Sequence, residues 1–227
     1  MVDAVLRRSR RRVSGRMAEA AAGYASQGWP VCTGAHLRDG ARRSHPVRGR
    51  DTGRACSCDR VGCPAPGAHP VSPAWQLEAT ADAGEVSRWW QERPRSNVIL
   101  VTGRVFDVLD VPAAAGPVAL AMMDKAGVRP GPVALSAGSR ALFFVTTRGT
   151  PGDEGEWWSC HLDCEPDNVA QVAGLRWHTR NSYVLAPPSR YGRGLAAHWI
   201  RARQEHPLPD ALRLLEFLAD ACEEVAG

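Results

Sequence analysis

Residues 34–74 constrain the fold of this 227-residue chain more than any other stretch of it. The segment is dominated by Gly, Pro, Arg, His and Cys, which disfavour both a regular helix and a regular strand. An irregular stretch of that length is uncommon inside a folded domain unless something organises it. The sequence therefore predicts a local organiser within residues 34–74.

A group of candidate metal ligands lies in the second half of this segment, with the spacing C-x-C-x4-C-x5-H. The four residues are Cys56, Cys58, Cys63 and His69. Thiolates and imidazole are ligands that zinc prefers, and four protein ligands leave no open coordination position. We therefore predict a structural zinc site that clips the loop together. Cys32 and His45 are substitutes if one of the four is not a ligand.

The N-terminus and the seven cysteines bear on the compartment of the protein. The arginine cluster at residues 7–12 is followed by no apolar signal-peptide core, and no apolar run approaches the length of a membrane span. We expect a cytoplasmic protein without membrane contact, in which clustered cysteines bind metal instead of forming disulfides. Cys160 and Cys164, with His161 between them, are either a second metal site or isolated core residues.

Positive charge is concentrated near the N-terminus. The formal net charge is +4, yet residues 1–60 contain 13 arginines against 5 acidic residues. This asymmetry favours contact with a polyanion, or else marks a disordered basic tail. We expect a flexible basic arm at residues 1–15, one domain at residues 16–205 that includes the 34–74 loop, and a C-terminal helix within residues 206–227.

Apolar periodicity predicts alternating helices and strands. The expected helices are 17–27, 80–93, 116–126 and 209–225, the last with Leu212, Leu215, Phe217, Leu218 and Cys222 on its apolar face. The expected strands are 29–33, 97–101, 105–111, 133–135, 142–146, 169–172 and 182–186. Residues 102–104 are expected to join two of these strands as a hairpin. The order of elements predicts an α+β domain with a largely antiparallel sheet.

Several segments, in this order, resemble one known family. They are YASQGWPV at residues 24–31, the cysteine cluster running into PGAHP, the WW helix followed by NVILVTG, the strand VFDVLDV, and SYVLAPPSRYGRG with HWI. Together they resemble the N-terminal bifunctional DNA primase/polymerase (prim-pol) domain of the archaeo-eukaryotic primase superfamily, over about residues 17–202. The resemblance implies an RRM-like catalytic half and a metal-dependent nucleotidyltransferase that primes or extends DNA in replication.

The resemblance also implies a two-metal site with Mg²⁺ or Mn²⁺, held by acids at positions i and i+2 of one strand. Asp110 takes the first of these positions as the candidate catalytic residue, and Pro112 replaces the second. Asp107 lies three residues from Asp110, so a regular strand places it on the opposite face. We expect Asp107 to be a solvated acid at the strand end.

The two other motifs of the family are also altered. Ala141 stands where the family has a phosphate-contacting histidine, and Arg176 stands near an expected acid. The polar residues left in these segments and in the SRYGRG turn are better suited to phosphates and bases than to metal. The candidate nucleotide- or nucleic-acid-binding residues are Ser139, Arg140, His178, Arg180, Arg190 and Tyr191, with Arg193 beside them.

Three hypotheses follow from these substitutions. The first is a prim-pol-fold protein that binds single-stranded DNA or nucleotide through a degenerate metal site. The second is an active primase/polymerase in which Asp163 or Glu165 completes a rearranged site with Asp110. The third is a non-catalytic, zinc-stabilised interaction module. Single-stranded DNA or a nucleotide is the expected ligand, and a helicase or another replication protein acting in trans is a candidate partner.

Overall fold

The computed structural model describes residues 15–38, 55–136, 140–147, 174–191, 195–202 and 206–227. The chain forms two compact units, each built from separate stretches of sequence. The first comprises Met1–Leu100 and Leu185–Ala197, and the second comprises Val101–Val184 and His198–Gly227. The expected basic arm, the 169–172 strand, Ser139, Arg193 and the Cys160–Cys164 pair lie outside the described residues.

The first unit combines helices with short strands. Residues 15–26 are helical. The other elements are β1 (Val31–Gly34), α2 (Trp75–Glu78), α3 (Ala83–Glu92), β2 (Asn97–Val101), β8 (Arg190–Tyr191) and β9 (Leu195–Ala196). β1 and β2 pair in antiparallel fashion from Val31 opposite Leu100 to Gly34 opposite Asn97. β8 and β9 form a separate antiparallel pair.

Helix α3 shows why the sequence signals in this unit were reliable. The side chain of Asp82 accepts a hydrogen bond from the Glu85 N–H at 2.7 Å, so the helix has the N-cap that its polar start predicts. Val86 and Trp90 are buried at helical spacing, and Pro94 follows the last turn. The helix expected at residues 80–93 is therefore confirmed. Trp89, however, lies only partly buried beside Trp90.

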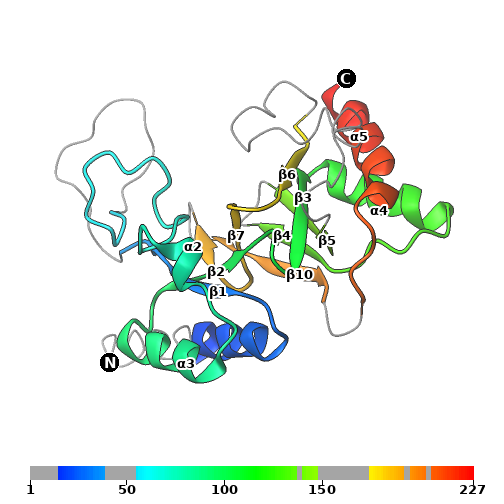
Figure 1. Cartoon of the computed structure of the whole chain (residues 1–227). Coiled ribbons are helices and arrows are strands. Elements are labelled where there is room, and N and C mark those ends of the chain that lie inside the picture. The colour runs from blue at the N-terminus through cyan, green and yellow to red at the C-terminus, as the bar shows by residue number, and fades with distance from the viewer. Residues whose placement is uncertain (1–14, 39–54, 137–139, 148–173, 192–194, 203–205) are drawn as a thin grey trace, which may run out of the picture. The chain divides into compact units, whose positions relative to one another are not determined.

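The second unit contains a five-stranded antiparallel sheet and two helices (Figure 1). Its strands are β3 (Phe106–Pro112), β4 (Val133–Ser136), β5 (Arg140–Thr146), β6 (Arg176–His178) and β10 (His198–Arg201). They lie in the order β10-β4-β5-β3-β6, and each neighbouring pair is antiparallel. The chain passes between the units within β2, within β7 (Tyr183–Leu185) and between Ala197 and His198. The mixed α/β class with antiparallel sheets is thus confirmed.

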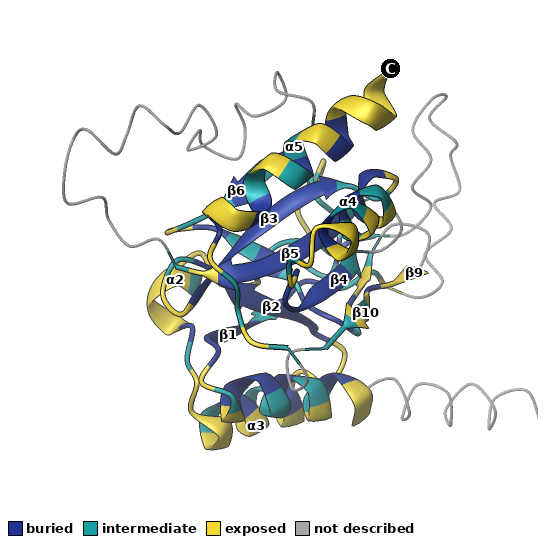
Figure 2. Ribbon diagram, turned by 90° about the vertical axis from the view of Figure 1, so that its right-hand side faces the viewer, coloured by how far each residue is buried: buried dark blue, intermediate teal, exposed yellow. Residues whose placement is uncertain are grey.

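Helices α4 (Ala115–Lys125) and α5 (Leu212–Ala226) lie side by side and share one apolar core with the sheet (Figures 1 and 2). The odd-numbered residues of β3, Leu109 and Val111, belong to that core. Even-numbered residues of β3 point to the opposite face, because side chains alternate along a strand. This alternation assigns each polar side chain of β3 to one of two environments.

Two expectations about these elements were wrong. Residues 102–104 do not close a hairpin, because both edges of β3 are taken by β5 and β6 while β2 pairs with β1. The apolar face expected for α5 was wrong only in part. Leu218 and Cys222 are buried and Leu215 and Phe217 pack against the core, but Leu212 is 53% exposed and Leu214 is buried in its place. Leu214 was missed because several leucines share this helix, so periodicity alone allows two neighbouring faces.

Candidate functional site

Asp110 lies on the face of the second unit's sheet that does not carry the α4 and α5 core. Its even position on β3 sets that direction, and the registers place it opposite Leu142 of β5 and Arg176 of β6. Only 5% of Asp110 is exposed. A carboxylate this deeply buried needs charged or hydrogen-bonding partners.

Arg140, the first residue of β5, is the main partner of Asp110. Its Nε donates a hydrogen bond to Asp110 Oδ1 at 2.5 Å, and its Nη2 donates to the Asp110 carbonyl at 2.9 Å. The same Nη2 donates to the carbonyl of Gly174. The guanidinium is therefore held by three acceptors and forms an ion pair that is mostly shielded from water.

His178, the last residue of β6, contacts the other oxygen of the same carboxylate. Its Nε2 lies 3.2 Å from Asp110 Oδ2, and its Nδ1 lies 2.9 Å from Ser182 Oγ. Both carboxylate oxygens of Asp110 thus have side-chain partners. We call Asp110, Arg140, His178 and Ser182 the Asp110 cluster.

Asp107 has a different environment from the one expected. It is only 2% exposed, so the prediction of a solvated strand-end acid was wrong. The registers place Asp107 opposite Val145 and on the odd-numbered face of β3, so the prediction that it faces away from Asp110 is confirmed. The burial follows from that face, because the odd-numbered residues of β3 and Val145 of β5 belong to the apolar core.

The remaining candidate binding residues are spread over both units. Arg180 is exposed in the turn that follows β6. That turn passes so close to Gly103 that a Cβ there would lie 2.2 Å from the Arg180 Cα, and Gly103 has a φ of +79°. Arg190 is exposed and Tyr191 partly exposed on β8 of the first unit. The structure therefore brings Arg140 and His178 to Asp110, and leaves Arg180 at the surface.

The four candidate metal ligands converge in the first unit. One ligand atom from each of Cys56, Cys58, Cys63 and His69 lies within 4.8 Å of all the others. Among the described residues, this is the one group of three or more His, Cys, Asp or Glu side chains that is close enough to hold a metal ion. We call it the Cys/His cluster. The predicted ligand set is thus brought together, and Cys32 is not part of it. His45, the other substitute, lies outside the described residues.

Local hydrogen bonds orient the ligands of the Cys/His cluster. His69 Nδ1 lies 2.7 Å from the carbonyl of Pro70, which fixes the proton on Nδ1 and leaves Nε2 free to bind metal. That Nε2 lies 3.4 Å from Cys56 Sγ. The N–H of Gly67 donates to the same sulfur at 3.3 Å, as is common for a metal-binding thiolate.

The two more exposed thiols of the Cys/His cluster differ in acidity. Burial of Cys63 is the main cause that raises its pKa to about 11, and the neighbouring Cys58 and Cys56 raise it further. Burial also acts to raise the pKa of Cys58, but hydrogen bonds from the Arg60 backbone and from neighbouring side chains lower it to about 7. Thiols held this close to one another favour loss of protons to a bound cation.

Asn97, at the start of β2, anchors the loop that carries this cluster and was missed by the sequence reasoning. Its Nδ2 donates to the carbonyls of Ala35 and Gly67 at 3.0 and 2.8 Å. It also lies 2.8 Å from the Arg190 carbonyl, and its Oδ1 accepts from the Arg190 N–H. Only its buried position reveals this role, because a single Asn at a strand start carries no distinctive spacing.

Comparison with protein families identifies the chain. The profile of the family described as bifunctional DNA primase/polymerase, N-terminal (Prim-Pol), matches residues 21–211. The chain belongs to this family. The match includes both the Cys/His cluster and the Asp110 cluster, so both lie within the Prim-Pol domain. A search of curated proteins found no match. None of the helices within the described ranges is long and apolar enough to span a membrane.

Proposed function

We propose that this Prim-Pol domain binds nucleotides or single-stranded DNA at the Asp110 cluster without catalysing two-metal nucleotidyl transfer there. The observation that carries the proposal is that protein side chains hold both oxygens of the Asp110 carboxylate. Arg140 contacts one oxygen and His178 contacts the other. Asp110 is thus already neutralised within the fold.

The side chains around Asp110 do not fit a pair of divalent cations. Mg²⁺ and Mn²⁺ require several oxygen ligands, which related enzymes supply from carboxylates and substrate phosphates. Here Pro112 occupies position i+2, and Asp107 lies on the other face of β3. An arginine remains protonated at any physiological pH, so Arg140 is a permanent competitor for the oxygens of Asp110. These side chains do not support a catalytic step through a metal at Asp110.

The same face is better suited to an anion. The Asp110 carboxylate shares it with the guanidinium groups of Arg140 and Arg176, and with the imidazole of His178. An excess of cationic donors attracts phosphate, and guanidinium groups bind phosphate through paired hydrogen bonds. Exposed Arg180 would extend this surface. As part of the same proposal, the second unit is an RRM-like half whose binding face lies opposite helices α4 and α5. The position of Asp110 on that face supports this assignment.

We assign the Cys/His cluster to structural zinc as part of this proposal. Three thiols and one imidazole are a donor set that zinc prefers and that Mg²⁺ does not. Four protein ligands leave no position for a substrate or a reactive water. The zinc would hold residues 55–74 in the conformation that Asn97 anchors.

The test is nucleotide incorporation on primed and unprimed single-stranded templates with Mg²⁺ or Mn²⁺, with template binding measured in parallel. We expect binding without incorporation, and the same absence of incorporation in Asp110→Ala. Incorporation that disappears in Asp110→Ala would refute the proposal and support a rearranged active site. Asp163 and Glu165, the acids considered for such a site, lie outside the described residues.

Variants of the basic residues test the binding half of the proposal. Arg180→Ala should weaken binding of template and nucleoside triphosphate several-fold, because removing one positive charge reduces the attraction to phosphates. Arg129→Ala, which removes an exposed arginine elsewhere in the second unit, is the matched control and should change little. Equal affinities of Arg180→Ala, the double variant Arg140→Ala/Arg180→Ala and the wild type would remove these residues from the site.

A further inference from the structure

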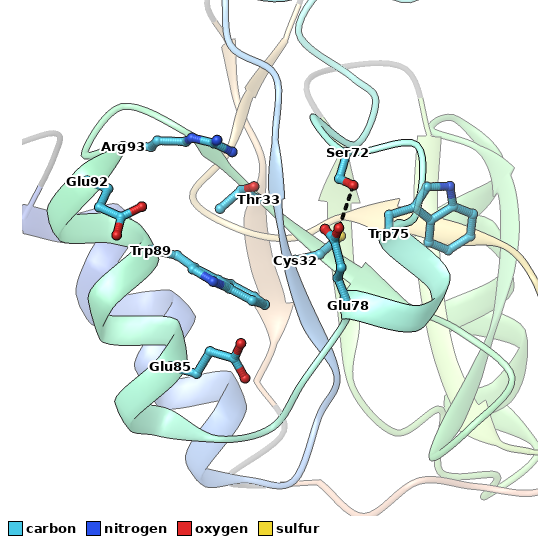
Figure 3. A pocket seen from close by; sticks show the side chains of 9 residues that line it. All are labelled: Cys32, Thr33, Ser72, Trp75, Glu78, Glu85, Trp89, Glu92 and Arg93. Carbon is cyan, nitrogen blue, oxygen red and sulfur yellow. Dashed lines mark hydrogen bonds between the residues drawn. The ribbon is translucent and has the colours of Figure 1, made fainter.

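The first unit contains a cavity of about 320 Å³ that the proposed nucleotide site does not use. It lies between β1, α2 and α3, and side chains from all three elements line it (Figure 3). Its volume is at the lower end of the range for ligand pockets, so it suits a small molecule or a single side chain. The residues that matter for its chemistry are Trp75, Glu78, Glu85, Trp89, Glu92 and Arg93.

Carboxylates and an aromatic ring lie together in this cavity. Along α3, the indole of Trp89 lies between Glu85 and Glu92 and extends across the pocket (Figure 3). Glu78 enters from α2 and is oriented by a hydrogen bond from Ser72 Oγ at 2.8 Å. The face of an indole attracts a cation, and nearby carboxylates add to that attraction. The lining therefore favours a positively charged ligand.

The charges in the cavity are not balanced by its own basic residues. Three carboxylates line it together with one guanidinium, that of Arg93. Arg88, outside the lining, approaches Glu85 only to 3.8 Å, in an exposed pair. Such a pair is weak in water and leaves most of the negative potential in place.

A metal ion does not fit this lining. Within the described ranges, no three of the glutamates approach one another closely enough to share an ion. The thiol of Cys32, which also lines the cavity, is 4% exposed, and burial followed by the charge of Glu78 raises its pKa to about 12. The Cys32 thiol therefore stays protonated and adds a largely apolar surface to the cavity instead of a metal ligand. The spacing of the acids and the aromatic wall instead match a larger, partly apolar cation.

We propose that this cavity binds an organic cation, a guanidinium or primary ammonium group carried on an apolar stem. The stem lies along the indole of Trp89, and the charged group lies among Glu78, Glu85 and Glu92. A free diamine and an arginine or lysine side chain of another protein share this chemistry. The site belongs to the first unit and does not depend on the function proposed for Asp110.

The test is isothermal titration calorimetry of the full, zinc-loaded chain with 1,5-diaminopentane and with N-acetyl-arginine-N-methylamide. N-acetyl-citrulline-N-methylamide, a neutral analogue of the arginine probe, serves as the ligand control. Glu85→Gln should weaken binding of both cations about tenfold, and Trp89→Leu should weaken it roughly fivefold. Arg93→Gln should tighten binding, because it removes the one cation of the lining.

Matched variants distinguish binding at this cavity from non-specific electrostatic attraction of cations to the protein. Glu216→Gln removes an exposed carboxylate from α5 in the second unit and should leave both affinities unchanged. Binding of either probe, with the expected effects of these variants, supports the proposal. The probe that binds more tightly indicates whether the natural ligand is a free diamine or a side chain of another protein. Absence of binding by both probes would overturn the proposal. So would equal binding of the citrulline analogue, or equal losses in Glu216→Gln and Glu85→Gln.

Discussion

The Cys/His cluster and the Asp110 cluster both gather ionisable side chains at one point, but their charges are balanced differently. In the first, four donor atoms face one another within 4.8 Å, a donor set whose thiolates are balanced by a metal cation. In the second, an acid is already paired with the guanidinium of Arg140 and the imidazole of His178. The donor set of the first cluster therefore suits a metal ion, whereas the charge of Asp110 in the second is balanced by the protein itself.

This difference shows how the proposed function is compatible with a stable fold. A buried carboxylate without a counter-charge is costly, so an Asp110 that binds no metal ion requires a cation from the protein. Arg140 supplies that cation from the neighbouring strand, where the register of β3 and β5 brings it within reach.

Metal removal should produce the largest effect and confine it to the first unit. Chelation, or replacement of a ligand in Cys56→Ser, should abolish zinc binding, which contributes on the order of 10 kcal/mol in small zinc-dependent folds. Hydrogen exchange should then rise in residues 55–74 and remain low in β3 and β5. Mass spectrometry of exchange and elemental analysis measure both results.

Cys32→Ala is the matched control for metal removal, because this thiol lies in the same unit but outside the Cys/His cluster. It should retain one zinc per chain. If no metal copurifies with the wild type and chelation leaves thermal melting unchanged, the structural role of the cluster is wrong.

Breaking the ion pair of the Asp110 cluster should have the next largest effect. Arg140→Met leaves a carboxylate that is only 5% exposed without its counter-charge, and should destabilise the protein by about 3–5 kcal/mol in urea unfolding. The double variant Asp110→Asn/Arg140→Met should recover part of this loss. Arg88→Ala removes the exposed partner of Glu85 and should cost less than about 1 kcal/mol.

If Arg140→Met and Arg88→Ala lose similar amounts of stability, Asp110 does not depend on a counter-charge from the protein. That result would contradict the difference described between the two clusters. Failure of the double variant to recover any stability would point to packing by the arginine stem instead.

A glycine substitution should disturb the Asp110 cluster through the backbone. Gly103→Ala places a Cβ 2.2 Å from the Cα of Arg180 at a φ of +79°, so the turn after His178 must shift. We expect a loss of about 3 kcal/mol from strain and overlap. Gly127→Ala, with a φ of +69° and no atom within 4 Å of the added Cβ, should cost about 1 kcal/mol. Equal losses in the two variants would show that the turn has room to move.

The smallest expected effect concerns a thiol that belongs to neither cluster. Burial raises the pKa of Cys32 from 9.0 to about 12, so above pH 9 the unfolded chain binds fewer protons than the folded one. Stability must then fall as pH rises, by about 1.4 kcal/mol between pH 8 and pH 10. Urea unfolding of the wild type should show this loss in excess of that in Cys32→Ala. If stability depends on pH in the same way in the wild type and in Cys32→Ala, this prediction is wrong.

The sequence was most informative where local rules dominate. Short ligand spacing predicted the Cys/His cluster, because Cys56 and His69 are close in sequence and the chain between them is rich in turns. The cap at Asp82 and the periodicity around Trp90 likewise predicted α3. The ordered resemblance of several segments predicted the family that the profile match confirms.

Contacts that depend on strand register were harder to predict. Arg140 is separated from Asp110 by 30 residues, and only the β3–β5 register shows that its guanidinium reaches the carboxylate. The absence of a hairpin at residues 102–104 follows from the choice of strand partners for β2 and β3. The burial of Asp107 depends on what packs against the odd-numbered face of β3. A strand pattern predicts which face a side chain occupies, but not which strand lies beside it.

One diffraction experiment tests the two clusters together. Crystals grown with Mn²⁺ and a nucleoside triphosphate can be measured at the zinc and manganese absorption edges. The account predicts a zinc signal among Cys56, Cys58, Cys63 and His69, and no manganese signal within bonding distance of Asp110. Manganese bound to Asp110, with Arg140 displaced from the carboxylate, would contradict it.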